Sequence, residues 1–557
     1  MITRIAAKWR GHSCPPRRHS CQRALFLFCT LALAHAQQPP VILISIDTLR
    51  ADHLSSYGYH HAQTPNIDSF ADHGTLFAAA DAQTPLTLPS HTSVLTSTYP
   101  FQNRIQENAE LVPPGAVTLA TVLKAHGYKT AAFIGSVFLE QRTGLNQGFD
   151  FYDSPFDFRV FSPMSGEIFY AGAGANPMTI RDRRDGAIVV RAATQWLAAN
   201  HGTQPVFAFV HLFDMHLPYR SGYDAQVAYV DQLMATFKQA LVRGGWWDRS
   251  LVILLSDHGE SLGEHGEASH GYFIYEATLH VPLLIHWPAS ATPLPARVDP
   301  PVALLDVAPT ILDFLHIATP PSFTGRTLLD RAPRPVAAES THAFDAFGWS
   351  PLRSIRMGEY KYIEAPKPEL YNLAADPQEQ TNLVTSDPGR AQAMHTALAR
   401  LLAAHQPKRP APASNLSPQQ RALLGSLGYV APGPKSAMPT LADPKDRLAE
   451  FQQYEDAQIA LYKGRPAEAA AILRKILAAD PRNTLARRDL GGIYLEQKSY
   501  TRARTELEKV AAVAADDYVT QYQLSLALDQ LHLADQSAAH LKLACAIAPD
   551  AAPCQKH

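Results

Sequence analysis

Residues 41–47 have the sequence Val-Ile-Leu-Ile-Ser-Ile-Asp, a nearly continuous apolar run that ends at a carboxylate. Most of its side chains are β-branched, and apolar and polar positions do not alternate. Such a run is typical of a strand that is buried on both faces of a parallel sheet. We therefore predict a buried parallel strand over residues 41–46 that ends at Asp47.

Similar apolar runs recur along a chain of 557 residues, which is long enough for more than one domain. They span residues 206–210, 251–255 and 281–285, and helical patterns at residues 186–200 and 223–243 lie among them. Pro282 in the last run indicates an edge strand, because proline cannot donate to a sheet ladder. This alternation predicts an α/β domain with a mostly parallel sheet.

Polar side chains follow three of these runs. Asp47 and His211 each stand directly after an apolar run, and the pair Asp257-His258 follows the third run after Ser256. A single Asp in such a place is usually a turn or cap residue. Ligands of α/β folds bind outside the carboxyl ends of the strands, so three such ends together indicate a site.

A second candidate feature is the segment at residues 87–91, Thr-Leu-Pro-Ser-His. Pro89 suits the first turn of a helix, which would put Thr87 just ahead of the helix N-terminus, where anions are favoured. Taken alone, the segment is more typical of a simple helix cap. A hydroxyl in this position can attack phosphorus or sulfur if a metal or base lowers its pKa.

The donors Asp47, Thr87, Asp257 and His258 together suit one divalent metal ion. Oxygen donors favour Mg²⁺, Ca²⁺ or Mn²⁺, and the imidazole moves the preference toward Mn²⁺ or Zn²⁺. The segment from His211 to Tyr219 adds His216, a candidate for protonating a leaving group. His270 is a candidate for stabilising charge on the transferred group.

The rest of the chain predicts two further parts. Residues 356–363 and 369–373 indicate short strands of a smaller antiparallel C-terminal subdomain, which completes a catalytic domain over residues 37–405. Residues 406–444 are rich in Pro, Ala and Ser and predict a linker, interrupted by a short helix at 418–427. We expect a chain truncated after about residue 406 to stay soluble with unchanged turnover.

Residues 445–557 contain a repeat with a period of 34 residues. This period, with small residues at two fixed positions and a turn position, matches an all-α stack of tetratricopeptide repeats. The alternative is an unrelated alanine-rich helical tail. Such repeats bind protein or peptide partners. The positions that define the period are Ala457, Gly491 and Ser525; Ala469, Ala503 and Ser537; and Pro481, Ala515 and Pro549.

The N-terminus predicts export. Basic residues precede an apolar run at residues 24–34, and Ala34-His35-Ala36 fits a signal-peptide cleavage site, so residues 1–36 are expected to be removed. An uncleaved membrane anchor is the alternative; the mature protein would otherwise be periplasmic or secreted. Export permits a disulfide between Cys545 and Cys554, although two free thiols fit equally well. The net charge of −2 gives no indication of nucleic-acid binding.

Taken in order, several segments resemble the sulfatase branch of the alkaline-phosphatase superfamily over residues 40–383. The resemblance implies one divalent metal held by Asp47, Asp257 and His258 with the nucleophile at position 87. It implies that His216 is the general acid and that His270 binds the transferred group. It further implies that Asn108 and His211 bind substrate. The matching segments are residues 46–53, 64–68, 87–91, 211–219, 256–260, 275–276, 361–363 and 369–373.

The chain also departs from the sulfatase pattern. Sulfatases carry C-x-P-S-R and oxidise its first residue to formylglycine, but threonine at position 87 would give a ketone, so no formylglycine is expected. His91 stands in place of the usual Arg and is kept as a catalytic candidate, and Thr48 replaces the second Asp of the metal pair. A threonine nucleophile instead resembles nucleotide pyrophosphatases and lipoteichoic-acid synthases, which form a covalent phosphothreonine.

We therefore predict an exported, metal-dependent hydrolase or transferase that acts on phosphate esters or diesters through Thr87. Its substrate would be a small-molecule, glycan or lipid ester. One alternative is a sulfuric ester hydrolase that works without formylglycine. A second alternative, motivated by Thr48 and His91, is an inactive recognition module with a tetratricopeptide scaffold.

Overall fold

A computed structural model describes residues 38–108, 110–156, 183–202, 204–217, 219, 221–407, 441–515 and 517–547. The expected signal peptide, the helix expected at residues 418–427, most of the expected linker and Cys554 lie outside these residues; Cys545 is disulfide-bonded. Within the described ranges, no helix combines the length and the apolar character needed to cross a membrane.

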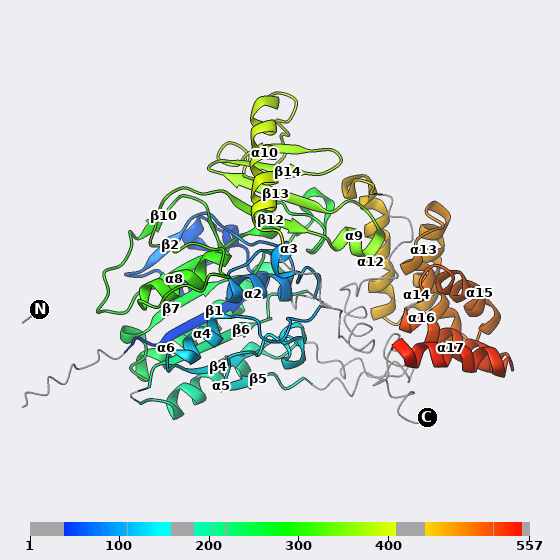
Figure 1. Ribbon diagram of the computed structural model, residues 1–557, viewed down its shortest axis with the longest axis horizontal. Helices are drawn as coiled ribbons and strands as arrows, with labels where there is room; N and C mark the ends of the chain where they lie inside the picture. Colours follow the sequence, from blue (N-terminus) through cyan, green and yellow to red (C-terminus); the bar gives the residue numbers. More distant parts are fainter. Residues whose placement is uncertain are drawn as a thin grey trace, which may run out of the picture. The chain divides into compact units, whose positions relative to one another are not determined.

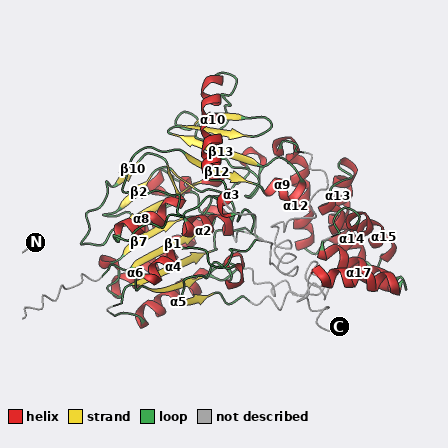
Figure 2. Cartoon of the chain, in the orientation of Figure 1, coloured by secondary structure: helices red, strands yellow, loops and turns green. Residues whose placement is uncertain are grey.

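The N-terminal part of the described chain is built on an eight-stranded sheet with the order β10-β2-β9-β7-β1-β6-β4-β5. Strands are yellow in Figure 2. The predicted strand is β1 (Val41–Ile46), and it pairs in parallel with β6 (Val206–Leu212) and β7 (Leu251–Leu255). All six residues of β1 are buried, as the continuous apolar run predicts. The other strands are β2 (Thr75–Phe77), β4 (Lys129–Phe133), β5 (Phe151–Asp153), β9 (Leu283–His286) and β10 (Arg297–Val298).

Helices cover both faces of this sheet (Figure 1). Ile42 and Ile44 of β1 share a hydrophobic cluster with α5 (Gly186–Ala199) and α6 (Tyr223–Arg243). Val41 and Leu43 join the opposite cluster, to which α2 (Thr87–Thr96), α4 (Leu119–Ala125) and α8 (Val307–Phe314) contribute. The sheet is therefore the middle of three layers, which confirms the predicted α/β class.

The prediction of an edge strand at residues 281–285 is wrong. The run divides into β8 (His280–Val281), which pairs with β3 (Ala80–Asp81), and β9, which lies between β2 and β7 and is antiparallel to both. Pro282 falls between β8 and β9 and belongs to neither strand. Its missing N–H is therefore not required by either ladder, and the run can continue into the sheet interior. β11 (Val302–Ala303) completes the small sheet of β3 and β8.

The predicted antiparallel subdomain is present as a four-stranded sheet, β12-β13-β14-β15. Residues 356–363 do not form one strand but a hairpin, because Gly358 turns the chain at a φ of +61° between β13 and β14. The strands are β12 (Val336–Ser340), β13 (Leu352–Met357), β14 (Tyr360–Glu364) and β15 (Glu369–Asn372), and α10 (Pro388–Ala404) packs on them. Shorter helices are α1 (Pro65–Asp68), α3 (Pro100–Asn103), α7 (Glu276–Leu279) and α9 (His342–Phe347).

The C-terminal part is a series of helix pairs, as the 34-residue period predicts. At the equivalent helix positions Ala457, Gly491 and Ser525 are all buried, and a Cβ on Gly491 would lie 2.7 Å from the Leu507 side chain. A small residue is therefore required where the helices approach most closely. The pairs are α12 (Leu448–Tyr462) with α13 (Pro466–Ala479), α14 (Thr484–Glu496) with α15 (Tyr500–Ala511), and α16 (Tyr518–Gln530) with α17 (Ala534–Ile547).

Candidate functional site

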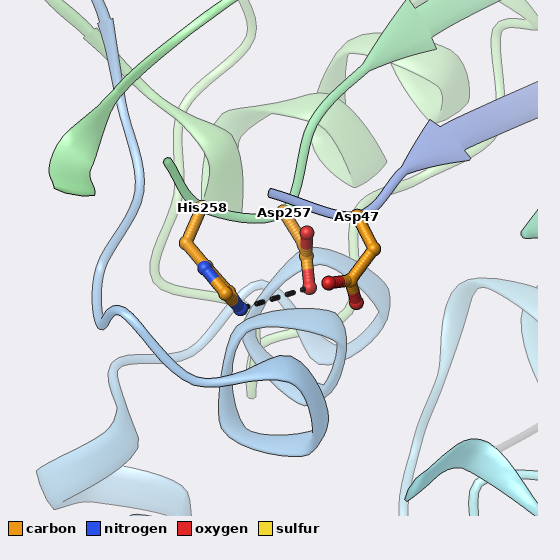
Figure 3. Close-up of side chains that lie close together, drawn as sticks. All are labelled: Asp47, Asp257 and His258. Atoms are coloured by element: carbon orange, nitrogen blue, oxygen red, sulfur yellow. Dashed lines mark ion pairs between the residues drawn. The ribbon is translucent and has the colours of Figure 1, made fainter. Parts of the chain in front are cut away.

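The carboxyl ends of β1 and β7 bring two buried carboxylates together. Asp47 follows β1, and Asp257 and His258 follow β7, its parallel neighbour. Figure 3 shows the three side chains pointing toward one another, and their ligand atoms all lie within 4.8 Å of one another. Within the described part of the chain, this is the one group of three or more His, Cys, Asp or Glu residues with such spacing.

The hydrogen bonding of this cluster fits a divalent cation. Asp47 Oδ1, Asp257 Oδ2 and His258 Nε2 are buried and have no hydrogen-bond partner among the described residues. Burial raises the pKa of both Asp47 and Asp257, and proximity to Asp47 raises that of Asp257 further. Burying a carboxylate oxygen without a hydrogen-bond partner costs free energy, and a bound cation would offset that cost. The donor set therefore suits one divalent ion, as the sequence predicts.

Thr87 lies at this cluster. It is the first residue of α2, not the residue just ahead of it, because Leu86 is the N-cap in extended conformation. Its Oγ1 donates a hydrogen bond to Asp47 Oδ2 at 3.2 Å, and the residue is fully buried. Ser90 Oγ donates to the backbone carbonyl of Asp257 at 2.6 Å and so ties the first turn of α2 to the end of β7.

Hydrogen bonds between the ends of β1 and β7 hold the backbone around the carboxylates. Leu49 N–H donates to Ser256 Oγ at 2.9 Å, and Ser256 Oγ donates to the carbonyl of His258 at 2.7 Å. Thr48, which replaces the second Asp of the sulfatase pattern, has a φ of +53°. Its backbone N–H donates to Asp257 Oδ1 at 3.4 Å. Thr48 therefore contributes to the cluster through its backbone.

His91 is buried beneath the site. Its Nδ1 donates to the carbonyl of Thr87 at 2.7 Å, so that Nε2 accepts from Ser45 Oγ at 2.9 Å. Burial and the neighbouring His211 hold the pKa of His91 well below its usual value. The ring is therefore neutral, and in this arrangement it supports the first turn of α2 without supplying the positive charge of an arginine.

His211 also faces the cluster. The structure extends β6 through Leu212, so His211 lies within the strand rather than after it. Its Nε2 is 3.4 Å from Asp47 Oδ2, and neither ring nitrogen has a hydrogen-bond partner in the described ranges. Burial lowers the pKa of His211 to about 3, which keeps the ring neutral.

His216 and His270 approach each other with ring centroids 5.1 Å apart, and the centroid of His270 is 4.5 Å from that of His258. His216 Nδ1 donates to the carbonyl of Leu217 at 2.8 Å. Burial, and next the neighbouring His270, hold the pKa of His216 well below its usual value, and burial lowers that of His270 to about 4. The three histidines therefore form one group beside the carboxylates.

Glu260 is a functional candidate that the sequence reasoning did not single out. Its Oε1 lies 2.8 Å from Nδ1 of His270, and its Oε2 accepts from the hydroxyl of Tyr219 at 3.0 Å. The sequence did contain an indication of Glu260, because this residue lies in the segment 256–260, which matches the sulfatase pattern. The carboxylate fixes the ring of His270 and directs its Nε2 away from Glu260.

Asn108 completes the set of predicted residues. It is buried beside the start of α2, where its Oδ1 accepts from the backbone N–H of Leu88 at 2.8 Å. Its Nδ2 donates to no acceptor in the described part of the chain. Asn108 thus presents an unused amide donor next to Thr87.

Two buried carboxylates and a hydroxyl at a helix N-terminus thus meet at the carboxyl edge of the sheet, where α/β folds bind their ligands. The family match and the relatives identify the protein class as an ester hydrolase of the alkaline-phosphatase superfamily. The sulfatase profile matches residues 39–317, and the chain belongs to the sulfatase family. A second profile, that of the N-sulphoglucosamine sulphohydrolase C-terminal region, matches residues 263–407, and a tetratricopeptide repeat profile matches residues 460–528.

Individual relatives agree with this assignment. Arylsulfatase K of Mus musculus is 24% identical over 430 residues, which covers 63% of this chain and 77% of the mouse protein. Choline-sulfatase of Rhizobium meliloti is 25% identical over 454 residues, covering 66% and 87% respectively. The crystal structure of the phosphonate monoester hydrolase of Agrobacterium radiobacter has the same fold, with a TM-score of 0.54, 22% identity, and coverage of 66% of this chain and 96% of that one.

Proposed function

We propose that the protein is an exported, metal-dependent hydrolase or transferase that acts on phosphate esters or diesters through Thr87. The substrate would be a small-molecule, glycan or lipid ester, and the tetratricopeptide repeats would bind a protein or peptide. No formylglycine is involved in this mechanism, because oxidation of a threonine cannot give an aldehyde.

The observation that carries the proposal is the position of the Thr87 hydroxyl. It lies at the N-terminus of α2 and within hydrogen-bond distance of Asp47, one of the three candidate metal ligands. Asp47, Asp257 and His258 would hold the metal together with Thr87. When bound, a divalent cation supplies positive charge that lowers the pKa of a neighbouring hydroxyl and offsets charge on the transferred group.

Side chains of the protein would carry out the transfer of the phosphoryl group to Thr87. Thr87 Oγ1 passes its proton toward Asp47 Oδ2 and attacks phosphorus, while the bond to the leaving oxygen breaks. Asn108 Nδ2 and His211 would be neutral donors to the transferred group. His270, whose Nδ1–H is donated to Glu260, would donate through Nε2 once the anionic ester favours its protonation. Water then hydrolyses the phosphothreonine, or an acceptor alcohol takes up the group.

His216 is proposed to protonate the leaving oxygen. Because burial lowers its pKa, the ring is neutral before substrate binds. An anionic ester beside the ring favours the imidazolium, so we expect His216 to take up its proton on substrate binding. His91 would act by holding Thr87 in place.

Two variants of Thr87 test the proposal. Thr87→Ala should lower turnover by about 10³-fold or more, as loss of a nucleophile does elsewhere. Thr87→Ser should keep much of the activity, because the hydroxyl remains. Mass spectrometry after acid quench should find added phosphate on the peptide that contains Thr87. Full activity of Thr87→Ala would contradict the proposal and favour direct attack by water.

Sulfate ester hydrolysis without formylglycine is a second candidate, and it is favoured by the relatives, several of which are sulfatases. Parallel assays distinguish the two candidate functions. They use aryl phosphate, phosphodiester, phosphonate and aryl sulfate, each with Mn²⁺, Zn²⁺, Mg²⁺ and Ca²⁺. A higher kcat/KM for the sulfate ester, with no phosphothreonine, would establish the second candidate in place of the first.

A further inference from the structure

Helix α12 contacts the loop that carries His270. His270 belongs to the segment between Ser261 and Tyr272, which is closed by a hydrogen bond from the N–H of Ser261 to the carbonyl of Ser269 at 2.7 Å. Ser269 Oγ donates to Glu455 Oε1 of α12 at 3.0 Å. His270 is therefore adjacent in sequence to a residue that is bound by α12.

Two further contacts hold the same loop. The ring of Phe451 lies 3.8 Å from that of Tyr272, measured between centroids, and both residues are buried in one cluster with Ala343 and Trp349. Gln452 Nε2 donates to the carbonyl of Gly266 at 2.7 Å. The contacts to Ser269 and Tyr272 thus lie on both sides of His270 in the sequence.

The contacting residues of α12 occupy one face of the helix. Phe451, Gln452 and Glu455, together with Leu448, follow the spacing of three and four residues that places side chains on a single face. Tyr454 and Ala457 lie on another face and are buried in the core of the repeats. α12 therefore uses different faces for the repeat core and for the loop of His270.

We propose that Glu455 and Phe451 are positioning residues through which α12 fixes the loop that carries His270. The inference rests on the proposed function of His270, but the contact itself does not. Catalysis depends on holding donors to within a fraction of an ångström of the transferred group. The first helix of the repeats, α12, thus helps to position His270 without contacting the transferred group.

The test uses full-length protein with Glu455→Ala, Glu455→Gln and Ser269→Ala. Glu468→Ala in α13 is the matched control, because Glu468 is half-exposed and pairs with Arg465 at the surface. Glu455→Ala and Ser269→Ala should lower kcat by about 10-fold or more. Metal content should stay unchanged, and hydrogen exchange of residues 264–273 should become faster. Glu455→Gln should retain most of the activity, because its amide oxygen can still accept from Ser269.

The double variant Ser269→Ala with Glu455→Ala should be no worse than either single variant, because both remove the same contact. Phe451→Leu should give the same faster exchange if α12 holds the loop. Wild-type kcat and exchange in Glu455→Ala, or additive losses in the double variant, would overturn the proposal. If the protein does not cleave the phosphate substrates, the exchange measurement still decides whether α12 holds the loop.

Discussion

The site contains several buried titratable side chains. Asp47, Asp257 and His258 are fully buried, and Figure 3 shows their side chains close together, with His258 Nε2 3.5 Å from Asp257 Oδ2. Asp47 Oδ1, Asp257 Oδ2 and His258 Nε2 have no hydrogen-bond partner among the described residues. Burial lowers the pKa of His258 to about 3, so its ring stays neutral and able to bind a metal across the physiological range. Such an arrangement is destabilising unless a cation is bound, which links metal binding to the stability of the site.

At the residue scale, Asp257→Asn should weaken metal binding by about 10²-fold or more and abolish activity. Loss of a residue that only hydrogen-bonds to a metal ligand already costs about 10–100-fold. The fold should persist, because the carboxylate stands at a strand end rather than in the apolar layers. Metal analysis of the purified variant and circular dichroism measure the two effects. Asp313→Asn, at an exposed position of α8, is the control; full metal occupancy in Asp257→Asn would refute the assignment.

Glu260 gives a second prediction at this scale. Glu260→Ala removes the acceptor that orients His270, so kcat should fall while metal content stays the same. Glu260→Gln should be less severe, because its amide oxygen can still accept from His270 Nδ1. Steady-state kinetics of both variants beside wild type test this; equal kcat in all three would show that His270 needs no such orientation.

At the scale of elements, a buried ion cluster joins the antiparallel sheet to the main domain. Arg356 of β13 pairs with Asp81 at 2.8 Å and with Glu276 of α7 at 3.0 Å. Lys361 of β14 pairs with Glu276 at 2.9 Å and with Glu379 at 3.0 Å. Lys361 belongs to a segment that matches the family pattern, and its contacts give it a structural role in holding the two sheets together.

This cluster predicts a pH dependence of stability. Burial opposes ionisation of Glu276, but Lys361 and Arg356 outweigh it and lower the pKa of Glu276 to about 2. The stabilisation is therefore complete above the ordinary glutamate pKa of 4.5 and is lost as the pH falls from there toward 2. Glu276→Gln should lower the free energy of unfolding by about 2 kcal/mol at pH 6.

The difference between wild type and Glu276→Gln should shrink as the pH is lowered through 4.5. Thermal unfolding at several pH values measures it, with Glu359→Gln in the exposed turn between β13 and β14 as the control. A difference in Tm that is independent of pH would mean that the charge of Glu276 contributes nothing to the contact.

At the scale of the whole molecule, the composition of residues 406–444 predicts a separable catalytic domain. The contacts of α12 lead us to expect otherwise, because its removal would expose Tyr272, Ala343 and Trp349, which are buried against Phe451. A chain that ends after residue 407 should therefore have a lower Tm and a lower kcat than the full chain.

Full-length Glu468→Ala is the control for this truncation, since Glu468 pairs with Arg465 at the surface of α13. Turnover on a small substrate and Tm are measured for both. Unchanged values after truncation at residue 407 would support the independent domain that the linker composition predicts, and would mean that the contacts of α12 have no effect on the site.

The sequence by itself determined the features that depend on local pattern. The apolar runs predicted the buried strands, and the period of 34 predicted the helix pairs. These predictions succeeded because burial on both faces of a sheet, and close approach of helices, restrict the residues at each position.

Only the tertiary structure decided which distant residues meet. It placed β9 inside the sheet, brought Glu260 against His270, and joined Ser269 to Glu455, which is 186 residues away. No local periodicity encodes such pairs, because each side chain is compatible with many partners until the chain is folded. The geometry around His270 is therefore a property of the whole fold, whereas the proposal of Asp47, Asp257 and His258 as metal ligands follows from the sequence.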